Sequence, residues 1–361
     1  MADTSVATGL TVEQWDDKYF REYIQEMPFK GESGTGENNI IQVKEDLMSK
    51  KGSTVHYALL NRLTGAGVTG TSTLEGNEEA LDTRSQAVSV IKRRNAVRVP
   101  EQDEQYSAVS LREAAKVGLK DWSIENTRDR ILTAMHSING VAYGSASEAN
   151  KDAWLVDNAD RVLFGAAISN NSSNDHSASL ANIDNTNDQL TSSAASLMKR
   201  IALTASPKIR PVRVKGMNRR YYCAYVHPLV MRDLKTDTVI TAAQREVSVR
   251  EQNNKLFEGG DIVWDGIIFK EVDDMPLLAG VGAAGIQVSP VFFCGAQAVA
   301  HAINRRWYST EEVFDYGDKH GCAINAFDGF EKLRFGTGSG DTDDLKDHGM
   351  VTGYFAAVAD S

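Results

Sequence analysis

Hydrophobic positions with a two-residue period mark two segments of the chain as extended strands. Residues 53–60 (STVHYALL) are rich in β-branched and aromatic side chains, and so are residues 87–91, which continue to residues 96–99. Between them, residues 63–85 consist largely of Gly, Thr, Ser, Asn and Glu. An insertion of this length in a compact domain is normally functional or disordered. The pattern predicts a two-stranded hairpin with a long irregular tip.

Opposite charges gather at the two ends of this hairpin. The basic residues on the returning strand are Lys92, Arg93, Arg94 and Arg98, and the acidic residues of the tip are Glu75, Glu78, Glu79 and Asp82. A long tip of one sign and a strand of the other can dock on a second copy of the same chain. We therefore interpret the hairpin as an extended loop that overlaps a neighbouring subunit.

After Pro100 the hydrophobic period becomes that of a helix. Ser110 and Glu113 have the spacing of a capping box. The apolar positions that share one helical face are Leu111, Ala115, Leu119, Trp122, Ile131, Met135 and Ile138. The pattern predicts one long helix over a sheet, or two collinear helices if residues 121–126 interrupt it.

The first 50 residues do not have the pattern of a compact domain. An amphipathic, aromatic-rich stretch that includes Trp15, Tyr19 and Phe20 precedes a glycine-rich run at residues 30–36. The apolar face of such a helix must be buried. It either folds back on the chain's own core or forms an arm that reaches a neighbouring subunit.

The rest of the chain mixes helices and strands without repeats. Residues 144–188 are polar and of low complexity. Helices are predicted over residues 190–201, after a capping box at Thr186 and Gln189, over 227–234 and over 296–303. Strands are predicted over 211–215, 221–226, 262–264, 267–269, 290–294 and 350–358, with turns at Gly216 and at Asp265-Gly266. This order predicts an α+β fold.

Composition and charge narrow the function classes. The 361 residues suffice for two or three compact lobes, and the net charge of -10 argues against a protein that binds nucleic acid by neutralising phosphates. Three scattered cysteines, Cys223, Cys294 and Cys322, favour reduced thiols over disulfides or a zinc site. The first residues lack signal-peptide features, and no apolar run is long enough to span a bilayer. We expect synthesis in a cytosol and no membrane partner.

One motif resembles a cofactor site. Gly65, Gly67 and Gly70 match GxGxxG, but the residues that follow are polar and soon interrupted by glycine. A dinucleotide fingerprint requires an apolar helix there, whose N-terminus receives the pyrophosphate. We interpret the motif as part of a loop.

Other candidate chemistry is equally weak. Asp341, Asp343, Asp344 and Asp347 lack the ligand spacing of an EF-hand and are interpreted as an acidic solvated loop. The histidines are dispersed, and His56 and His301 fall within strand and helix patterns. Asp273-Asp274 has the composition of a turn. We expect no catalytic residue, cofactor or metal, and hence no enzyme.

Several runs resemble a known family. Residues 39–47 (NIIQVKEDL), 63–70 (LTGAGVTG) and 74–81 (LEGNEEAL) resemble major capsid proteins of tailed bacteriophages, in particular the podophage group whose virions carry an RNA polymerase. Residues 257–267 and the terminal strand from Gly349 also resemble this family. The resemblance covers most of the chain and is strongest over residues 39–99.

The resemblance implies the HK97 capsid fold. It implies an N-terminal arm at residues 1–50, an extended E-loop at 51–100, a P domain with a long spine helix at 101–150, an A domain at 151–325 and a return to the P domain at 326–361. Residues expected between subunits are Trp15, Tyr19, Phe20, Gly65, Gly67, Gly70, Glu75, Glu78, Glu79, Arg93, Arg94 and Arg98.

The resemblance also implies the function. The chain is expected to self-assemble, through pentamers and hexamers, into the icosahedral shell that encloses the dsDNA of a tailed phage, without sequence-specific DNA binding. A separate scaffolding protein and a portal are expected partners in the host cytoplasm, and a decoration protein is left open. The alternatives are an encapsulin-like protein compartment and a nucleotide-binding oxidoreductase built on the glycine motif.

Overall fold

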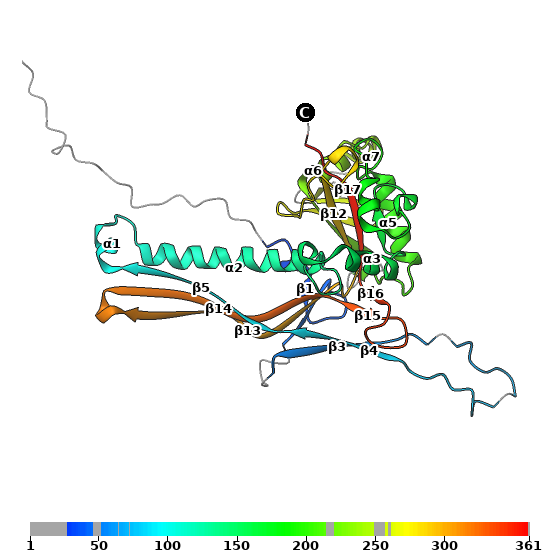
Figure 1. Cartoon of the computed structure of the whole chain (residues 1–361), viewed down its shortest axis with the longest axis horizontal. Coiled ribbons are helices and arrows are strands. Elements are labelled where there is room, and N and C mark those ends of the chain that lie inside the picture. Colours follow the sequence, from blue (N-terminus) through cyan, green and yellow to red (C-terminus); the bar gives the residue numbers. More distant parts are fainter. Residues whose placement is uncertain are drawn as a thin grey trace, which may run out of the picture. The chain divides into compact units, whose positions relative to one another are not determined.

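The computed structural model describes most of the chain (Figure 1). The described residues are 27–45, 52–63, 65–71, 73–213, 220–248, 257–258 and 261–359. Trp15, Tyr19 and Phe20, on which the predicted arm depends, lie outside them. The described chain divides into two compact units. One contains Lys92–Thr127 and Arg306–Phe327, and the other contains Pro28–Ile91, Arg128–Arg305 and Asp328–Ser361.

Helices and strands alternate irregularly, as expected for an α+β fold. The α-helices of the described residues are α1 (Glu101–Tyr106), α2 (Leu111–Met135), α3 (Glu148–Asp157), α4 (His176–Ala181), α5 (Ser192–Thr204), α6 (Pro228–Thr236) and α7 (Thr238–Ser248). Short 3-10 turns are η2 (Lys30–Glu32), η4 (Tyr143–Ser145), η5 (Ile168–Asn170), η6 (Ala283–Gly285) and η7 (Asp315–Gly317).

The strands form four sheets within the described residues. They are β1 (Ser33–Gly34), β2 (Ile41–Lys44), β3 (Thr54–Leu60), β4 (Thr83–Ser89), β5 (Ile91–Pro100), β6 (Val162–Phe164), β7 (Val212–Arg213), β8 (Arg220–Val226), β9 (Phe257–Glu258), β10 (Asp261–Trp264), β11 (Ile267–Glu271), β12 (Val288–Cys294), β13 (Val299–Phe314), β14 (Lys319–Lys332), β15 (Arg334–Gly336), β16 (Leu345–Asp347) and β17 (Met350–Ala356). Two sheets, β3-β4 and β15-β16, are two-stranded, and a five-stranded sheet has the order β1-β2-β13-β14-β5.

An eight-stranded sheet carries the main core of its unit. Its order is β6-β17-β12-β8-β11-β10-β9, with β7 paired to β8. All residues of the central strands β12 and β17 are buried, as in a sheet covered on both faces. Side chains of β17 alternate between two clusters: Val351 and Phe355 pack with α5 and α6, and Tyr354 packs with α3 and α4. The C-terminal strand is thus paired within this sheet, between β6 and β12.

The long helix α2 is continuous over 25 residues, so residues 121–126 do not interrupt it (Figure 1). Helix α1 precedes it and was not predicted. The predicted capping box at Thr186 and Gln189 is wrong, because α5 begins later. The Thr191 side chain caps α5 by accepting a hydrogen bond from the Ala194 N–H.

Several local predictions are confirmed because short-range chemistry decides them. Asp265 and Gly266 join β10 to β11 in a two-residue turn, with φ of 49° and 75°. His227 precedes α6 and caps it, with Pro228 at the first helical position. The predicted pair 211–215 and 221–226 is observed as β7 and β8, while Gly216 lies outside the described residues. Asp273-Asp274 is a turn, as predicted.

One further prediction fails where longer-range contacts decide, and a segment whose order the sequence left open is folded. Residues 296–303 do not form a helix: Val299 begins β13, which pairs in parallel with β2. His301 therefore lies in a strand. Residues 144–188 are polar in sequence but contain α3, β6 and α4, and Trp154, Leu155 and Phe164 are buried in them. A few large apolar side chains anchor this segment on the sheet.

Candidate assembly surfaces

The predicted hairpin is present, but its returning strand is β4, and the prediction that this strand carries the basic residues 92–98 is wrong, because they lie on β5 of the five-stranded sheet. The base of the hairpin is anchored on its own unit. Strands β3 and β4, here called the hairpin base, pair in antiparallel register from Thr54 opposite Ser89 to Leu60 opposite Thr83. One face of the base is buried in a small core. The members of that core are Val55, Tyr57, Val88, Ala300, Ala302, Leu333 and Phe335. This packing fixes the root from which the rest of the hairpin extends.

Gln86 locks the hairpin base to the backbone that follows β14. Its amide oxygen accepts a hydrogen bond from the Arg334 N–H at 2.8 Å, and its amide nitrogen donates to the Lys332 carbonyl at 3.0 Å. The side chain is only 7% exposed. Beside it, the Ser85 hydroxyl donates to Asp341 at 2.9 Å. Buried hydrogen bonds of this kind specify one register.

Gly329 permits the close approach of strand β4 to strand β14. A Cβ atom at this position would lie 2.0 Å from the carbonyl oxygen of Ser89. Any larger residue would therefore push the two strands apart. Neither Gly329 nor Gln86 could be identified from the sequence, because neither residue belongs to a motif and each acts through a partner distant in sequence.

Beyond the base lie residues 61–82, here called the hairpin tip, and their described residues form a long open loop (Figure 1). Four large apolar side chains in or next to the tip face solvent. Their exposed fractions are 66% for Leu60, 53% for Leu63, 64% for Leu74 and 56% for Leu81. Leucines within a polar insertion are the sequence signal that could have identified these positions. Exposed leucines on an extended loop can be buried against a partner.

The predicted tip residues have local structural roles. The Gly65 N–H donates to the Glu79 carboxylate at 2.7 Å, and the Gly76 N–H donates to Glu78 at 2.8 Å. Gly67 and Gly70 both have φ of 70°, a conformation that other residues adopt only with strain. Among the described residues that come after the GxGxxG run, none up to the start of β4 is helical, as the loop interpretation predicted. Glu75 is exposed on the tip.

The three predicted arginines all lie on β5, in the other unit. Arg93, Arg94 and Arg98 are exposed. The guanidinium of Arg98 lies 4.6 Å from the centre of the Phe314 ring, a cation–π distance. Within the described residues, Arg93 and Arg94 make no ion pair. The structure brings the tip glycines and glutamates together, whereas the arginines belong to a separate basic strand.

A groove of about 350 Å³ lies on the unit that contains the start of α2. Its lining combines apolar and charged side chains from α2, β13 and β14: Leu119, Trp307, Cys322, Ile324, Lys116 and Lys120. The ring of Trp122 contacts Trp307 edge-to-face at 5.9 Å. A side chain of another molecule that entered this groove would contact a partly apolar surface.

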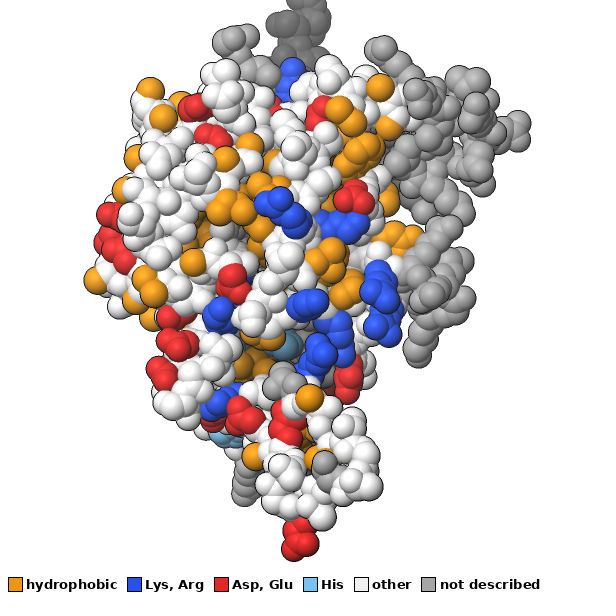
Figure 2. All heavy atoms as spheres, turned by 90° about the vertical axis from the view of Figure 1, so that its right-hand side faces the viewer, with side chains coloured by type: hydrophobic (Ala, Val, Ile, Leu, Met, Phe, Trp, Pro, Cys, Tyr) orange, Lys and Arg blue, Asp and Glu red, His pale blue; other side chains and the backbone are white. Residues whose placement is uncertain are grey.

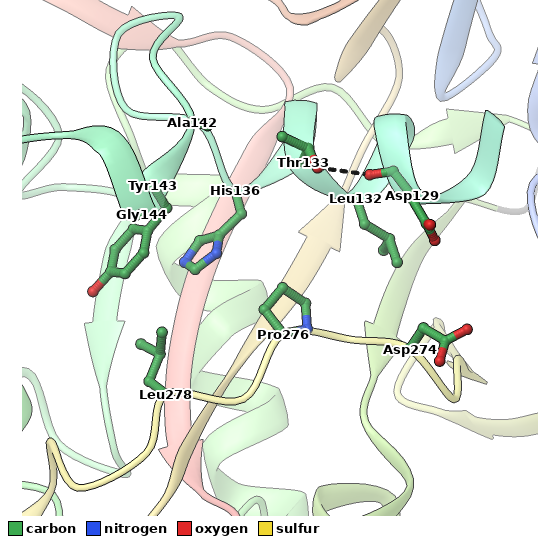
Figure 3. Close-up of a pocket in the computed structure, with 10 residues that line it drawn as sticks. All are labelled: Asp129, Leu132, Thr133, His136, Ala142, Tyr143, Gly144, Asp274, Pro276 and Leu278. Carbon is green, nitrogen blue, oxygen red and sulfur yellow. Dashed lines mark hydrogen bonds between the residues drawn. The ribbon is translucent and has the colours of Figure 1, made fainter. Parts of the chain in front are cut away.

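A second hollow, of about 360 Å³, lies beside the C-terminal end of α2 (Figure 3). Figure 3 shows the His136 and Tyr143 rings side by side at one end, with Asp129 and Asp274 at the other. Burial lowers the pKa of His136 to about 3, and both carboxylates pair with Arg128. The groups drawn form no nucleophile with an adjacent base.

The acidic run near the C-terminus divides into two kinds of residue. Asp341, Asp343 and Asp344 lie in an exposed loop, as predicted. Asp347 does not: it is buried at the end of β16 and pairs with the equally buried Lys332 at 2.8 Å. The burial of Asp347 follows from its position on β16 and not from the charge pattern of the sequence.

The remaining predictions concern thiols, membranes and the surface. Cys223, Cys294 and Cys322 are free and buried. Among the described residues, no helix is both long and apolar enough to cross a membrane.

Figure 2 shows hydrophobic side chains scattered among charged ones on the face it presents. Such a mixed surface suits weak contacts repeated many times.

The chain is similar to known phage capsid proteins. Residues 3–359 match the family model described as phage capsid protein. The major capsid protein of Pseudomonas phage KPP25 is 30% identical over 350 residues, which cover 90% of this chain and 89% of that protein. The capsid of cyanophage Pam1 superimposes with a TM-score of 0.88 at 32% identity over all of both chains. The capsid of Ralstonia phage GP4 shares the fold, with a TM-score of 0.77 at 21% identity over all of both chains.

Fold and comparisons together define a shell-building protein with an HK97-like fold. The chain belongs to the phage capsid protein family, and it is a major capsid protein, the structural subunit of a phage shell. The finer likeness to podophages that carry an RNA polymerase stays a prediction.

Proposed function

We propose that the hairpin tip of each subunit lies over its neighbour in the shell and closes contacts within pentamers and hexamers. The observation that carries this proposal is the exposure of Leu60, Leu63, Leu74 and Leu81 on a loop whose base is firmly anchored. Removing these side chains from water on assembly supplies a free energy of about 25 cal/mol per Å² of apolar surface. The anchored base delivers the tip at a defined position.

The same proposal assigns a role in the shell to each segment of the chain. Residues 1–50 serve as an N-terminal arm that latches an adjacent subunit, 51–100 as the E-loop, and 101–150 with 326–361 as the P domain. Residues 151–325 form the A domain at the symmetry axes. The pairing of β17 within the eight-stranded sheet means that the terminal segment contributes to that sheet as well.

Further partners complete the proposed assembly. A separate scaffolding protein and a portal act during assembly in the host cytoplasm, and the finished icosahedral shell holds dsDNA without reading its sequence. The net charge of -10 supports a container wall that does not adhere to its contents. A decoration protein on the outer surface is compatible with this assembly.

The test is assembly of the full-length chain, with its scaffolding protein, observed by negative-stain electron microscopy. Closed shells, tubes or five- and six-membered rings are expected from the natural sequence. The double variant Leu74→Asp, Leu81→Asp should remain folded but form no shells. A matched variant, Val239→Asp, alters a 50% exposed apolar residue on α7 and should still assemble. Normal shells from the tip variant would overturn the docking role of the tip.

A further inference from the structure

A basic segment extends from helix α5 to strand β8. Residues 199–220 contain eight Lys or Arg residues and no Asp or Glu, in a chain whose net charge is -10. The net charge of the whole chain therefore does not reveal this local excess of positive charge. On the face that Figure 2 presents, Lys and Arg side chains gather near the middle. The exposed basic residues of the segment, among those described, are Arg200, Lys208, Arg210, Arg213 and Arg220.

Two of these arginines lie directly opposite each other on neighbouring strands. Arg213 of β7 pairs in register with Arg220 of β8, and both residues are exposed. Residues directly opposite in antiparallel strands project from the same face, with Cβ atoms about 5 Å apart. Like charges in such a pair repel each other and destabilise the pairing. An anion in contact with both guanidinium groups would remove this repulsion.

Both arginines project on the side of the sheet that carries α5. Tyr222 and Ala224 of β8 belong to the core that packs on this helix. Side chains alternate along a strand, so Arg220 projects on the same side as these two residues. Its partner Arg213 projects on that side as well, because directly opposite residues share a face.

Helix α5 and the loop after it add two further cations on this side. Arg200 is exposed on α5, and Lys208 is exposed in the loop that leads to β7. The Ile209 N–H donates to the backbone carbonyl of Ala202 at 3.1 Å, so this loop runs back beside the helix. The four residues that we call the basic surface are Arg200, Lys208, Arg213 and Arg220.

Three carboxylates beside the basic surface are each paired with a different cation. The ion pairs are Glu37–Arg210 at 3.5 Å, Asp160–Lys346 at 3.3 Å and Asp265–Lys199 at 2.7 Å. Within the described residues, no ion pair involves any of the four cations of the basic surface. The described part of the subunit therefore leaves these four charges unneutralised.

The acidic groups that a second copy offers on its hairpin tip are already engaged. Glu78 and Glu79 accept hydrogen bonds from backbone N–H groups of the tip, and Asp82 pairs with Arg84 at 2.9 Å. A DNA duplex, in contrast, carries one negative charge per about 1.7 Å of its axis. Arginine forks match the geometry of phosphate oxygens. Charge complementarity therefore favours the duplex as the partner of the basic surface.

The composition around the basic surface favours a duplex over a single strand. Residues 192–213 contain no aromatic residue on which an unpaired base could stack. Proteins that bind single strands combine basic grooves with such stacking platforms. Contacts from Arg and Lys to phosphates position a duplex and carry no sequence information.

We propose that the basic surface binds the phosphate backbone of double-stranded DNA without reading its sequence. This inference rests on the proposed function, in which the shell holds dsDNA. The rest of the chain carries an excess of negative charge and repels the duplex, so contact with the wall is confined to this surface. Weak contacts repeated on many subunits hold the outermost DNA at the wall.

The test measures binding of the unassembled full-length subunit to a fluorescent duplex by anisotropy, between about 50 and 200 mM NaCl. Four phosphate contacts predict that log K falls with log [NaCl] with a slope of about -3.6. The double variant Arg213→Gln, Arg220→Gln should bind more weakly and make this slope shallower by about two, because each lost phosphate contact removes about one. Duplexes of unrelated sequence should bind equally.

A matched control removes two positive charges elsewhere on the chain. The double variant Lys30→Gln, Lys120→Gln changes exposed lysines of η2 and α2 and should keep the natural affinity and slope. The double variant Arg200→Gln, Lys208→Gln should weaken DNA binding as the arginine pair does. It keeps the proposal testable if the variant at β7 and β8 fails to fold.

Either of two results would contradict the proposal. One is natural DNA affinity in a folded double variant of the basic surface. The other is displacement of the duplex by a poly-glutamate peptide at equal concentration of charge, which would assign the surface to an acidic protein. Shell formation is scored separately by electron microscopy, where both basic-surface variants should assemble. Failure of the natural chain to form shells would count against the proposed function and would leave the measured DNA affinity unchanged.

Discussion

Lys332 Nζ lies 2.8 Å from Asp347 Oδ2, although both side chains are almost excluded from solvent. The Trp154 indole N–H donates to the same carboxylate oxygen at 3.2 Å, and the Lys332 ammonium lies 5.1 Å from the centre of the Trp154 ring. Burial lowers the pKa of Lys332, and the charge of Asp347 opposes that shift. The pair links the end of β14 to β16 and α3, and thus joins the hairpin's anchor to the main core.

Removing one partner of this pair should be costly. Lys332→Met leaves Asp347 as an uncompensated buried charge, which should lower the free energy of unfolding by about 3–5 kcal/mol. Chemical denaturation of the subunit measures this loss. Lys319→Met breaks an exposed ion pair with Asp315 and should leave the denaturation midpoint unchanged. Equal effects of the two variants would contradict a special role for burial.

Gln86→Leu should loosen the hairpin without unfolding the rest of the subunit. The substitution leaves the Arg334 N–H and the Lys332 carbonyl without their partner, at a cost of about 1–3 kcal/mol. Hydrogen exchange should increase in β3 and β4, and shell yield should fall. Gln102→Leu, at an exposed position on α1, serves as the control. Unaltered exchange in the hairpin would show that the apolar core alone holds the base.

Acid should destabilise the subunit partly through His136. Its folded-state pKa of about 3 lies below the unfolded value of about 6.5, so only the unfolded chain takes up a proton as the pH falls from 7 to 5. The stability contributed by the neutral ring is complete above pH 6.5 and is lost progressively toward pH 3. Between pH 7 and pH 5 this loss amounts to about 2 kcal/mol.

The variant His136→Phe keeps an aromatic ring against Tyr143, which stacks on His136 at 4.0 Å. Its unfolding free energy should fall less between pH 7 and pH 5 than that of the natural chain, by the same about 2 kcal/mol. Urea denaturation at both pH values measures the difference. His56→Phe, on the exposed side of β3, should retain the natural pH dependence. Parallel pH profiles for all three proteins would exclude His136 as the source.

Reversing the charge of the basic strand should block assembly. The triple variant Arg93→Glu, Arg94→Glu, Arg98→Glu should give a folded subunit by circular dichroism but no shells by electron microscopy, if these exposed arginines dock on acidic surface of a neighbour, as we predict. The corresponding triple lysine variant keeps the charge and should assemble. Normal particles from the glutamate variant would rule out electrostatic docking by these residues.

Much of the hairpin could be predicted from sequence because its signals are local. Alternating apolar residues mark β3 and β4, and the polar composition between them marks the tip. The anchor could not be predicted, because Gln86 and Gly329 act only through Arg334 and Ser89, which distant parts of the chain supply.

By itself the sequence determined the elements that short-range chemistry specifies, such as the Asp265-Gly266 turn and the Pro228 helix start. In both, φ preferences and capping act within a few residues. Only the tertiary structure decided that Val299–Phe314 is a strand, since pairing with β2 overrides an ambiguous apolar run. It also decided that Asp347 is buried beside Lys332, because the free energy of a charge depends on the partners that folding places around it.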